Sequence, residues 1–182
     1  MANQSITLGG GCFWCVEAVY EMVDGVLAVQ SGYANGHVSE PSYAQVCDGN
    51  TGHAEVVRVD FDDIRITLRE VLEIFFTVHD PTTLNRQGND VGSQYRSGIY
   101  WHDAAQREVA QSVLDEAQQA HKGRVVTELQ ALSNWWPAED WSLATGVLTA
   151  LAYLAAAVPL TWWWFGRFRQ GPIEALWSRA SG

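Results

Sequence analysis

Cysteine, basic side chains and targeting signals are all scarce in this chain of 182 residues. Three cysteines cannot all pair, and they are too few for a disulfide scaffold. Lysine and arginine number 11 against 21 acidic residues, so the sequence offers no basic face and we expect no nucleic-acid partner. The opening segment MANQSITLGGG has neither the basic nor the apolar region of a secretory signal, which predicts a cytoplasmic protein.

The composition predicts a folded body with an appended tail. Apolar residues make up 47% of the chain and charged residues 18%, which excludes a disordered protein or a fibre, and the length allows one domain with a buried core. The charged residues after Trp141 are Arg167, Arg169, Glu174 and Arg179, a net +2, which leaves −12 for the first 141 residues. We therefore expect a body over 1–141 and an apolar helical tail over 142–182.

Residues 143–165 form a run without a charged side chain, and tryptophans 162–164 lie near its end. A run of this length followed by Arg167 and Arg169 is typical of a membrane-spanning helix with an aromatic belt. An apolar helix packed on the body is the alternative. The orientation of such a helix raises a conflict. The positive-inside rule would place both arginines in the cytoplasm and therefore the acidic body outside, yet the body has no export signal.

Hydrophobic periodicity over the first 141 residues predicts strands and helices in alternation, joined by short turns. The stretch from His79 to Ser97 is instead long and polar, and such loops are more often functional than idle. The predicted strands are Ser5–Leu8, Val26–Tyr33, Ala54–Phe61, Gly98–Trp101 and Arg124–Leu129, and the predicted helices are Phe13–Met22, a turn within Pro41–Cys47, Leu68–Val78 and Asp103–Ala120. This order predicts an α/β (α+β) sandwich.

The candidate reactive residue is Cys12, in the segment GGGCFWC at a predicted strand-to-helix turn. Glycines let a ligand approach the backbone, and a helix N-terminus supplies free N–H groups and positive potential. Both stabilise a thiolate, so we expect a lowered pKa for Cys12 and a reactive thiol at neutral pH. A small buried core cysteine is the alternative.

Cys12 and Cys15 form a CxxC pair, which occurs in thioredoxin-like proteins and in zinc sites. A structural zinc site needs four ligands, and beside this pair the sequence offers Cys47 and scattered histidines, so we expect no metal. The flanking glycines do not fit the thioredoxin pattern. A general thiol–disulfide oxidoreductase using Cys12 and Cys15 stays open as an alternative.

Several segments of the chain occur together in a recognisable order. They are GGGCFWCVEAVY (Gly9–Tyr20), SGYANG (Ser31–Gly36), TGHAEVV (Thr51–Val57), HDPTTLNRQGNDVGSQYRSGIY (His79–Tyr100) and NWWPAED (Asn134–Asp140). Residues 5–141 thereby resemble the A-type peptide-methionine sulfoxide reductases. The resemblance implies a two-layer α/β sandwich with a ferredoxin-like core. It also implies reduction of methionine S-sulfoxide, free or in proteins, through a cysteine sulfenic acid and a disulfide that thioredoxin or dithiothreitol reduces, without a cofactor.

The resemblance also implies roles for particular residues. Cys12 would be the nucleophile, Phe13 and Trp14 the cage of the methyl group, Glu55 the proton donor to the sulfoxide oxygen, Tyr33 and Tyr95 the hydroxyls that hold this oxygen, and Asp90 a carboxylate that seats substrate and water. The role of Glu55 requires a carboxyl that is partly protonated near neutral pH, and hence a partly dry site. Core packing, a solvated strand face and a turn-forming Asp are the alternatives for these aromatics and carboxylates.

The chain departs from the family towards its C-terminus. No cysteine follows Cys47, whereas many relatives carry resolving cysteines in a C-terminal tail. Cys15 is slightly favoured as the resolving thiol because it lies three positions from Cys12 on one helix; Cys47 and direct reduction by an external thiol stay open. The usual Tyr-His-Gln is replaced by Trp141-Ser142, and Phe165–Trp177 resembles the last membrane segment of a bacterial multi-span membrane-protein family. A catalytically impaired remnant fused to a membrane segment is therefore the rival to an active reductase.

Overall fold

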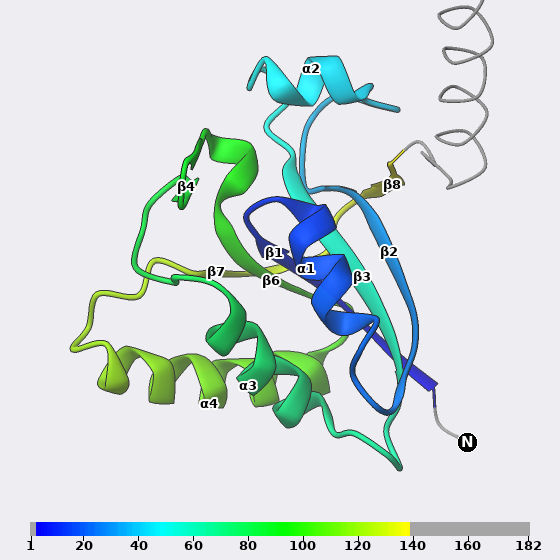
Figure 1. Ribbon diagram of the computed structural model, residues 1–182, viewed down its shortest axis with the longest axis vertical. Coiled ribbons are helices and arrows are strands. Elements are labelled where there is room, and N and C mark those ends of the chain that lie inside the picture. Colours follow the sequence, from blue (N-terminus) through cyan, green and yellow to red (C-terminus); the bar gives the residue numbers. More distant parts are fainter. Residues whose placement is uncertain (1–2, 139–182) are drawn as a thin grey trace, which may run out of the picture. The chain divides into compact units, whose positions relative to one another are not determined.

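A six-stranded sheet lies at the centre of the computed structural model, which describes residues 3–138 (Figure 1). Its strands, in the spatial order β7-β6-β1-β3-β2-β8, are antiparallel except for the parallel pair β6 and β7. Their bounds are β1 Asn3–Gly10, β2 Val26–Ala34, β3 Ala54–Asp62, β6 Ser97–Trp101, β7 Glu128–Ala131 and β8 Trp135–Pro137.

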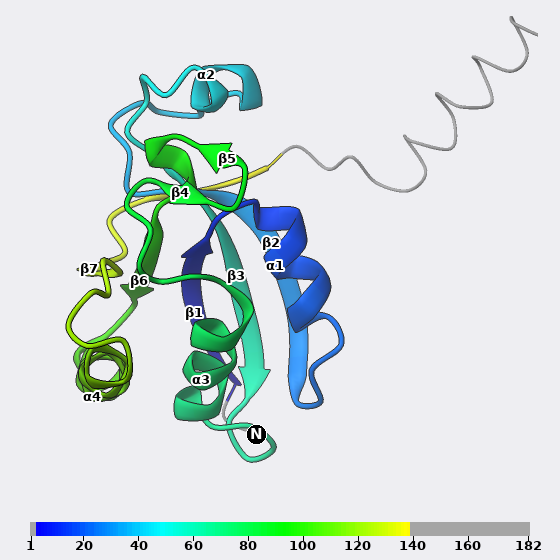
Figure 2. The same ribbon diagram turned by 60° about the vertical axis from the view of Figure 1, so that its left-hand side comes forward.

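Within residues 3–138, the remaining elements are four helices, a two-stranded ribbon and a single turn of 3₁₀-helix. They are α1 Phe13–Tyr20, α2 Tyr43–Cys47, α3 Leu68–Val78, α4 Ala104–Ala120, β4 Arg86–Gln87, β5 Asp90–Val91 and the 3₁₀-helix η1 Ser93–Tyr95. Figure 2 shows α1 and α3 lying over the same face of the sheet, which makes two layers. Strands β1, β2, β3 and β6 with helices α1 and α3 form a β-α-β-β-α-β unit. The predicted mixed α/β class is confirmed.

The core lies between the sheet and these helices because the sequence alternates in β3 and has an apolar stripe in α3. Val57, Val59 and Phe61 of β3 are fully buried, while the residues between them are partly exposed. Helix α3 buries Val71, Leu72 and Phe75. Its first turn is closed by a capping box between Thr67 and Glu70, which satisfies backbone N–H groups at the helix start.

The predicted helix Leu68–Val78 has the bounds that the structure shows, whereas the predicted strand Arg124–Leu129 is misplaced. Val125 donates its N–H to the side chain of Gln118, and Val126 donates to the carbonyl oxygen of Pro81. These partners replace the ladder bonds of a sheet, so β7 begins only at Glu128.

The long polar stretch after α3 holds the β4–β5 ribbon and η1. Figures 1 and 2 both place α2, this ribbon and the first turn of α1 at one end of the sheet. The predicted tail over 142–182, with its apolar helix, lies outside the described residues. Within residues 3–138, no helix has the length and apolar character that crossing a membrane requires.

Candidate active site

The turn between β1 and α1 presents Cys12 at the start of the helix. Gly11 has a φ of 94°, a conformation that favours glycine, and Cys12 is the N-cap residue of α1. A Cβ on Gly11 would lie 2.6 Å from Cβ of Gln87, so the ribbon packs directly on this glycine. Gln87 is itself tied to the backbone of Asp80 by two hydrogen bonds of 3.2 Å. The glycine thus lets the ribbon approach the reactive turn.

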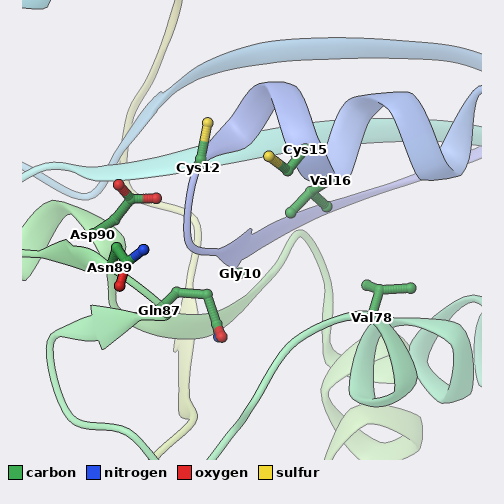
Figure 3. Close-up of a pocket in the computed structure, with 9 residues that line it drawn as sticks. Gly10, Cys12, Cys15, Val16, Val78, Gln87, Asn89 and Asp90 are labelled. Carbon is green, nitrogen blue, oxygen red and sulfur yellow. The ribbon is translucent and has the colours of Figure 1, made fainter.

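A groove of about 420 Å³ opens beside Cys12 (Figure 3). Cys12, Cys15 and Val16 border it from α1, and Gln87, Asn89 and Asp90 border it from the segment of β4 and β5. Cys12 is partly exposed, Cys15 and Cys47 are exposed, and all three thiols are free. The pair that the sequence singled out therefore lies side by side at a solvent-accessible groove.

The electrostatic environment of Cys12 differs from the prediction. Partial burial raises the pKa of the Cys12 thiol above its ordinary value, and the charge of Cys15 adds to this rise. The backbone N–H groups of Cys15 and Trp14 lower the pKa, as expected at a helix start, but burial outweighs them. The predicted fall of the Cys12 pKa is therefore wrong, and the resting residue is a thiol at neutral pH.

Glu55 lies next to this turn from the middle of the sheet. Its side chain is 2% exposed, and its Oε2 accepts a hydrogen bond of 3.3 Å from the backbone N–H of Phe13. Burial raises the pKa of Glu55 to about 7; the Phe13 N–H lowers it, and the charge of Asp90 raises it. A carboxyl with this pKa is half protonated at neutral pH, which is the state that the sequence argument required of it.

Aromatic side chains surround Cys12 and Glu55. Phe13 is 1% exposed, and its ring centroid lies 5.1 Å from that of Trp14 and 5.7 Å from that of Tyr33. Tyr33 is also buried and pairs with Glu55 in the register of β2 and β3. Trp14 is 50% exposed, so its ring is open to a ligand while those of Phe13 and Tyr33 belong to the interior.

Tyr95 and Asp90 reach the same place from the loop before β6. Asp90 is exposed on β5 and borders the groove, and Tyr95 is half-buried on η1. Burial raises the pKa of Tyr95, and nearby acidic groups raise it further. In descending order of effect, these groups are Glu55, Cys47, Asp90 and Cys12. The Tyr95 hydroxyl thus lies within electrostatic reach of the thiol and of both carboxylates.

Tyr43 lies beside the candidate site residues, and the sequence analysis did not name it. Its ring centroid lies 6.0 Å from that of Trp14, and its pKa is raised to about 12, chiefly by a hydrogen bond with Cys47 and also by the charges of Glu55 and Tyr95. The turn within Pro41–Cys47 was predicted, but the direction of its tyrosine depends on how α2 is held over the sheet. A tyrosine at the start of a short helix is a weak signal by itself.

The described part of the chain offers no set of side chains that could bind a metal ion. Between residues 3 and 138, no three His, Cys, Asp or Glu side chains gather in a way that could hold an ion.

The side chains gathered around Cys12 offer a thiol, a buried carboxyl with a pKa near neutrality and two phenols. Together these groups can attack an electrophilic atom and protonate an oxygen bound to it.

Comparison with known proteins assigns this site to a family. Residues 4–142 match the family model described as peptide methionine sulfoxide reductase. A peptide methionine sulfoxide reductase MsrA of Saccharolobus solfataricus is 56% identical over 135 residues, which are 74% of this chain and 76% of that relative.

Solved structures agree with the sequence match. Mxr1 of Saccharomyces cerevisiae in reduced form superposes with a TM-score of 0.74 at 38% identity, covering 76% of this chain and 81% of that one. Mxr1 in complex with Trx2 gives a TM-score of 0.58 at 29% identity, covering 76% and 83%. The chain therefore belongs to the family of peptide methionine sulfoxide reductases and is an oxidoreductase that reduces methionine sulfoxide.

Proposed function

We propose that Cys12 reduces the S epimer of methionine sulfoxide, free or in proteins, with Glu55 as the proton donor. The observation that carries this proposal is the position of the Glu55 carboxyl. It is buried, has a pKa of about 7, and is hydrogen-bonded to the N–H of Phe13, the residue next to Cys12. A proton can therefore be delivered to an oxygen on any sulfur that Cys12 attacks.

In the first step Sγ of Cys12 attacks the sulfoxide sulfur while the sulfoxide oxygen takes a proton from Glu55. The attack forms a bond between the two sulfurs, and this bond breaks as the hydroxyl passes from the methionine sulfur to Sγ of Cys12. Methionine thus leaves with a lone pair restored on its sulfur, and Cys12 becomes a sulfenic acid. The substrate is reduced by two electrons and the cysteine is oxidised by two. Trp14, with Phe13 behind it, is suited to the methyl group because an aromatic face excludes water without adding charge.

The hydroxyls that hold the oxygen are best supplied by Tyr95 and Tyr43. Both lie within reach of the charge of Glu55, and the ring of Tyr43 lies beside that of Trp14. Tyr33, which the family resemblance suggested, pairs with Glu55 in the sheet but has its ring packed on Phe13. Asp90 raises the Glu55 pKa from the rim of the groove, which suits a role in seating substrate and water.

The second step forms a disulfide between Cys12 and Cys15. The Cys15 thiol attacks Sγ of the Cys12 sulfenic acid, and the hydroxyl leaves as water. Contact between the two sulfurs is supported by the effect that Cys15 has on the Cys12 pKa through both its charge and a side-chain hydrogen bond. Cys47 is the second candidate, because its charge and that of Cys12 both act on Tyr95.

An external dithiol then reduces the disulfide, and no cofactor takes part. Thioredoxin is the proposed physiological reductant, since a related yeast reductase has been solved in complex with Trx2. A general thiol–disulfide oxidoreductase would have no use for a buried carboxyl beside its thiol. Disulfide reduction by this chain should accordingly be slow, and it should be insensitive to Glu55→Gln.

The test is turnover of the separate R and S epimers, first with dithiothreitol and then with thioredoxin. We expect methionine from the S epimer alone and no turnover by Cys12→Ser. Cys15→Ser should keep turnover with dithiothreitol, which can reduce a sulfenic acid directly, and should lose it with thioredoxin. Equal rates on both epimers contradict the assignment, and stoichiometric thiol oxidation without turnover indicates the impaired remnant instead.

We further propose, from the sequence, that residues 1–141 are the catalytic domain and 142–182 a separate tail. The uncharged run 143–165 is long enough to contact or span a membrane. A spanning run with the catalytic domain in the cytoplasm would insert against the positive-inside rule, because Arg167 and Arg169 would then lie on the opposite side. A tail of this kind would keep the reductase close to oxidised proteins at a membrane surface.

A further inference from the structure

The loop between α3 and β6 carries Asp90 and Tyr95 to the site, and its two ends are fastened together. His79, at its start, has its Nε2 2.7 Å from Oγ of Ser97, at its end. Oγ of Ser97 lies 2.7 Å from Oγ1 of Thr127, and all three side chains are buried. These contacts close the base of the loop. They do not determine where Tyr95 lies relative to Glu55, because Glu55 belongs to strand β3.

Arg96 makes that connection. Its Nη1 donates a hydrogen bond of 2.9 Å to the carbonyl oxygen of Ser93, and its Nη2 donates one of 3.1 Å to the carbonyl oxygen of Gly52. Ser93 is the first residue of η1, the turn that ends with Tyr95. Gly52 lies in the turn that leads into β3, three positions before Glu55. One guanidinium therefore joins the backbone segments that present the phenol and the carboxyl.

The guanidinium is itself held by Glu128 of the edge strand β7. Nε of Arg96 donates to Oε1 of Glu128 at 2.8 Å, and the two side chains are 16% and 26% exposed. The same oxygen accepts a hydrogen bond of 2.5 Å from the buried hydroxyl of Tyr100. Each of the three guanidinium nitrogens of Arg96 thus donates a hydrogen bond to a different segment, which restricts the arrangements that the side chain can adopt.

We propose that Arg96, oriented by Glu128, is a positioning residue that sets the place of the Tyr95 hydroxyl relative to the Glu55 carboxyl. It touches neither substrate nor the reacting atoms. Its contribution is to hold donors in place before the sulfoxide oxygen arrives, and a misplacement of about 1 Å at a reacting group can cost roughly a hundredfold in rate. The inference rests on the proposed function, in which both groups act on one oxygen.

Lysine cannot replace arginine here, because an ammonium is a compact point charge without a planar fork that reaches three acceptors. Arg96→Lys keeps the charge opposite Glu128 but leaves the carbonyl of Ser93 or Gly52 without its donor. Glu128→Gln keeps the shape of the acceptor while removing its charge. Arg96→Lys weakens this hydrogen-bonded connection on the donor side, and Glu128→Gln weakens it on the acceptor side.

The experiment is a mutant cycle with Tyr95→Phe, read as the single-turnover rate of methionine release without any reductant. If Arg96 acts by placing the Tyr95 hydroxyl, Arg96→Lys should slow the wild-type background roughly tenfold and the Tyr95→Phe background less than about twofold. A general structural role would lower the rate by the same factor in both backgrounds. Glu128→Gln should show the same non-additivity and replaces Arg96→Lys if that variant does not fold.

Arg69→Lys is the matched control, because Arg69 makes an exposed ion pair with Glu116 between α3 and α4. It should leave the single-turnover rate unchanged. Equal factors in the two Tyr95 backgrounds, or full activity of Arg96→Lys, overturn the role of Arg96 while the proposed function stands. An inactive wild-type chain overturns the proposed function and this inference with it.

Discussion

Cys12 and Glu55 together hold one proton at pH values between the Glu55 pKa of about 7 and the raised pKa of Cys12. Burial holds the Cys12 pKa above its ordinary value and the Glu55 pKa at about 7, so between these values the resting pair is a thiol and a carboxylate. The reaction needs a thiolate and a protonated carboxyl, which contain the same number of protons. In the proposed reaction, the proton that Cys12 loses is therefore balanced by the proton that Glu55 carries, and the pair needs no net uptake of a proton from solvent.

This proton count predicts the pH dependence of kcat/KM. The rate should be flat between about 7 and the raised pKa of Cys12, should fall below about 7 where both groups are protonated, and should fall again where both are ionised. Glu55→Gln should lower the rate at about pH 8 by roughly a hundredfold or more. Its rate should then rise with pH through the Cys12 pKa, without the alkaline fall.

The measurement is the rate with free methionine S-sulfoxide from acid to alkaline pH. Glu73→Gln is the control because Glu73 is exposed on α3 and belongs to no part of the site. A Glu55→Gln profile that keeps both limbs of the wild-type curve would show that Glu55 does not carry the proton.

Glu55 also links stability to pH, and the sign follows from its raised pKa. A carboxyl whose pKa rises from 4.5 to about 7 on folding favours the folded state fully below 4.5 and loses this contribution as pH rises to about 7. Glu55→Gln removes the cost of burying the charge. We expect it to be up to about 3 kcal/mol more stable than wild type at about pH 8 and nearly neutral near about pH 4. Urea unfolding at both pH values measures this, and an equal difference at both would contradict it.

At the scale of elements, α1 starts where it does because of one glycine and one packed glutamine. Gly11 must have a positive φ and must leave room for the Gln87 side chain, which a Cβ would meet at 2.6 Å. Gly123 provides a comparison, since it also has a positive φ, 73°, but nothing would lie within 4 Å of its Cβ. Comparing the two glycines therefore separates the free-energy cost of a side chain at positive φ from the cost of its contact with Gln87.

Gly11→Ala should therefore lose more stability than Gly123→Ala. Both variants carry the conformational cost of roughly 1–2 kcal/mol, and Gly11→Ala must in addition displace Gln87. It should also slow methionine release in a single turnover because Cys12 follows Gly11 directly, whereas Gly123→Ala should not. Thermal unfolding and single-turnover assays of the two variants give the comparison. Equal losses in both would show that the contact with Gln87 carries no energy.

Local patterns predicted the elements whose stability is local, and failed where partners come from elsewhere. The capped apolar stripe of Leu68–Val78 and the alternation after Glu55 are visible in the sequence, and both elements lie where they were predicted. The residues after Arg124 resemble a strand, yet Gln118 and Pro81 supply their hydrogen-bond partners. The direction of the Cys12 pKa was missed for the same reason, because burial depends on segments that only the fold brings to α1.

At the scale of the whole molecule, the site is assembled from three distant segments at one end of the sheet. The β1–α1 turn brings Cys12, the α2–β3 segment brings Tyr43 and Glu55, and the loop before β6 brings Asp90 and Tyr95. The sequence motifs named most of these side chains as candidates, since each motif is local. The Arg96 connection between two of the segments could not be predicted, because its partners Gly52 and Glu128 are far apart in the chain.

The uncharged run 143–165 gives the last prediction, which concerns where the whole chain resides. If this run spans a membrane, the full-length protein should stay in the membrane pellet after a carbonate wash, because about 20 apolar residues suffice to cross the hydrocarbon layer. An arginine near the centre of the run, Leu154→Arg, should shift protein to the supernatant, since a charge there costs roughly 3 kcal/mol of insertion. Leu84→Arg, at an exposed position of the catalytic domain, should have no effect. Complete release of the wild-type chain by carbonate would rule out a spanning tail, and turnover of S-sulfoxide in whichever fraction holds the protein would locate the repair activity.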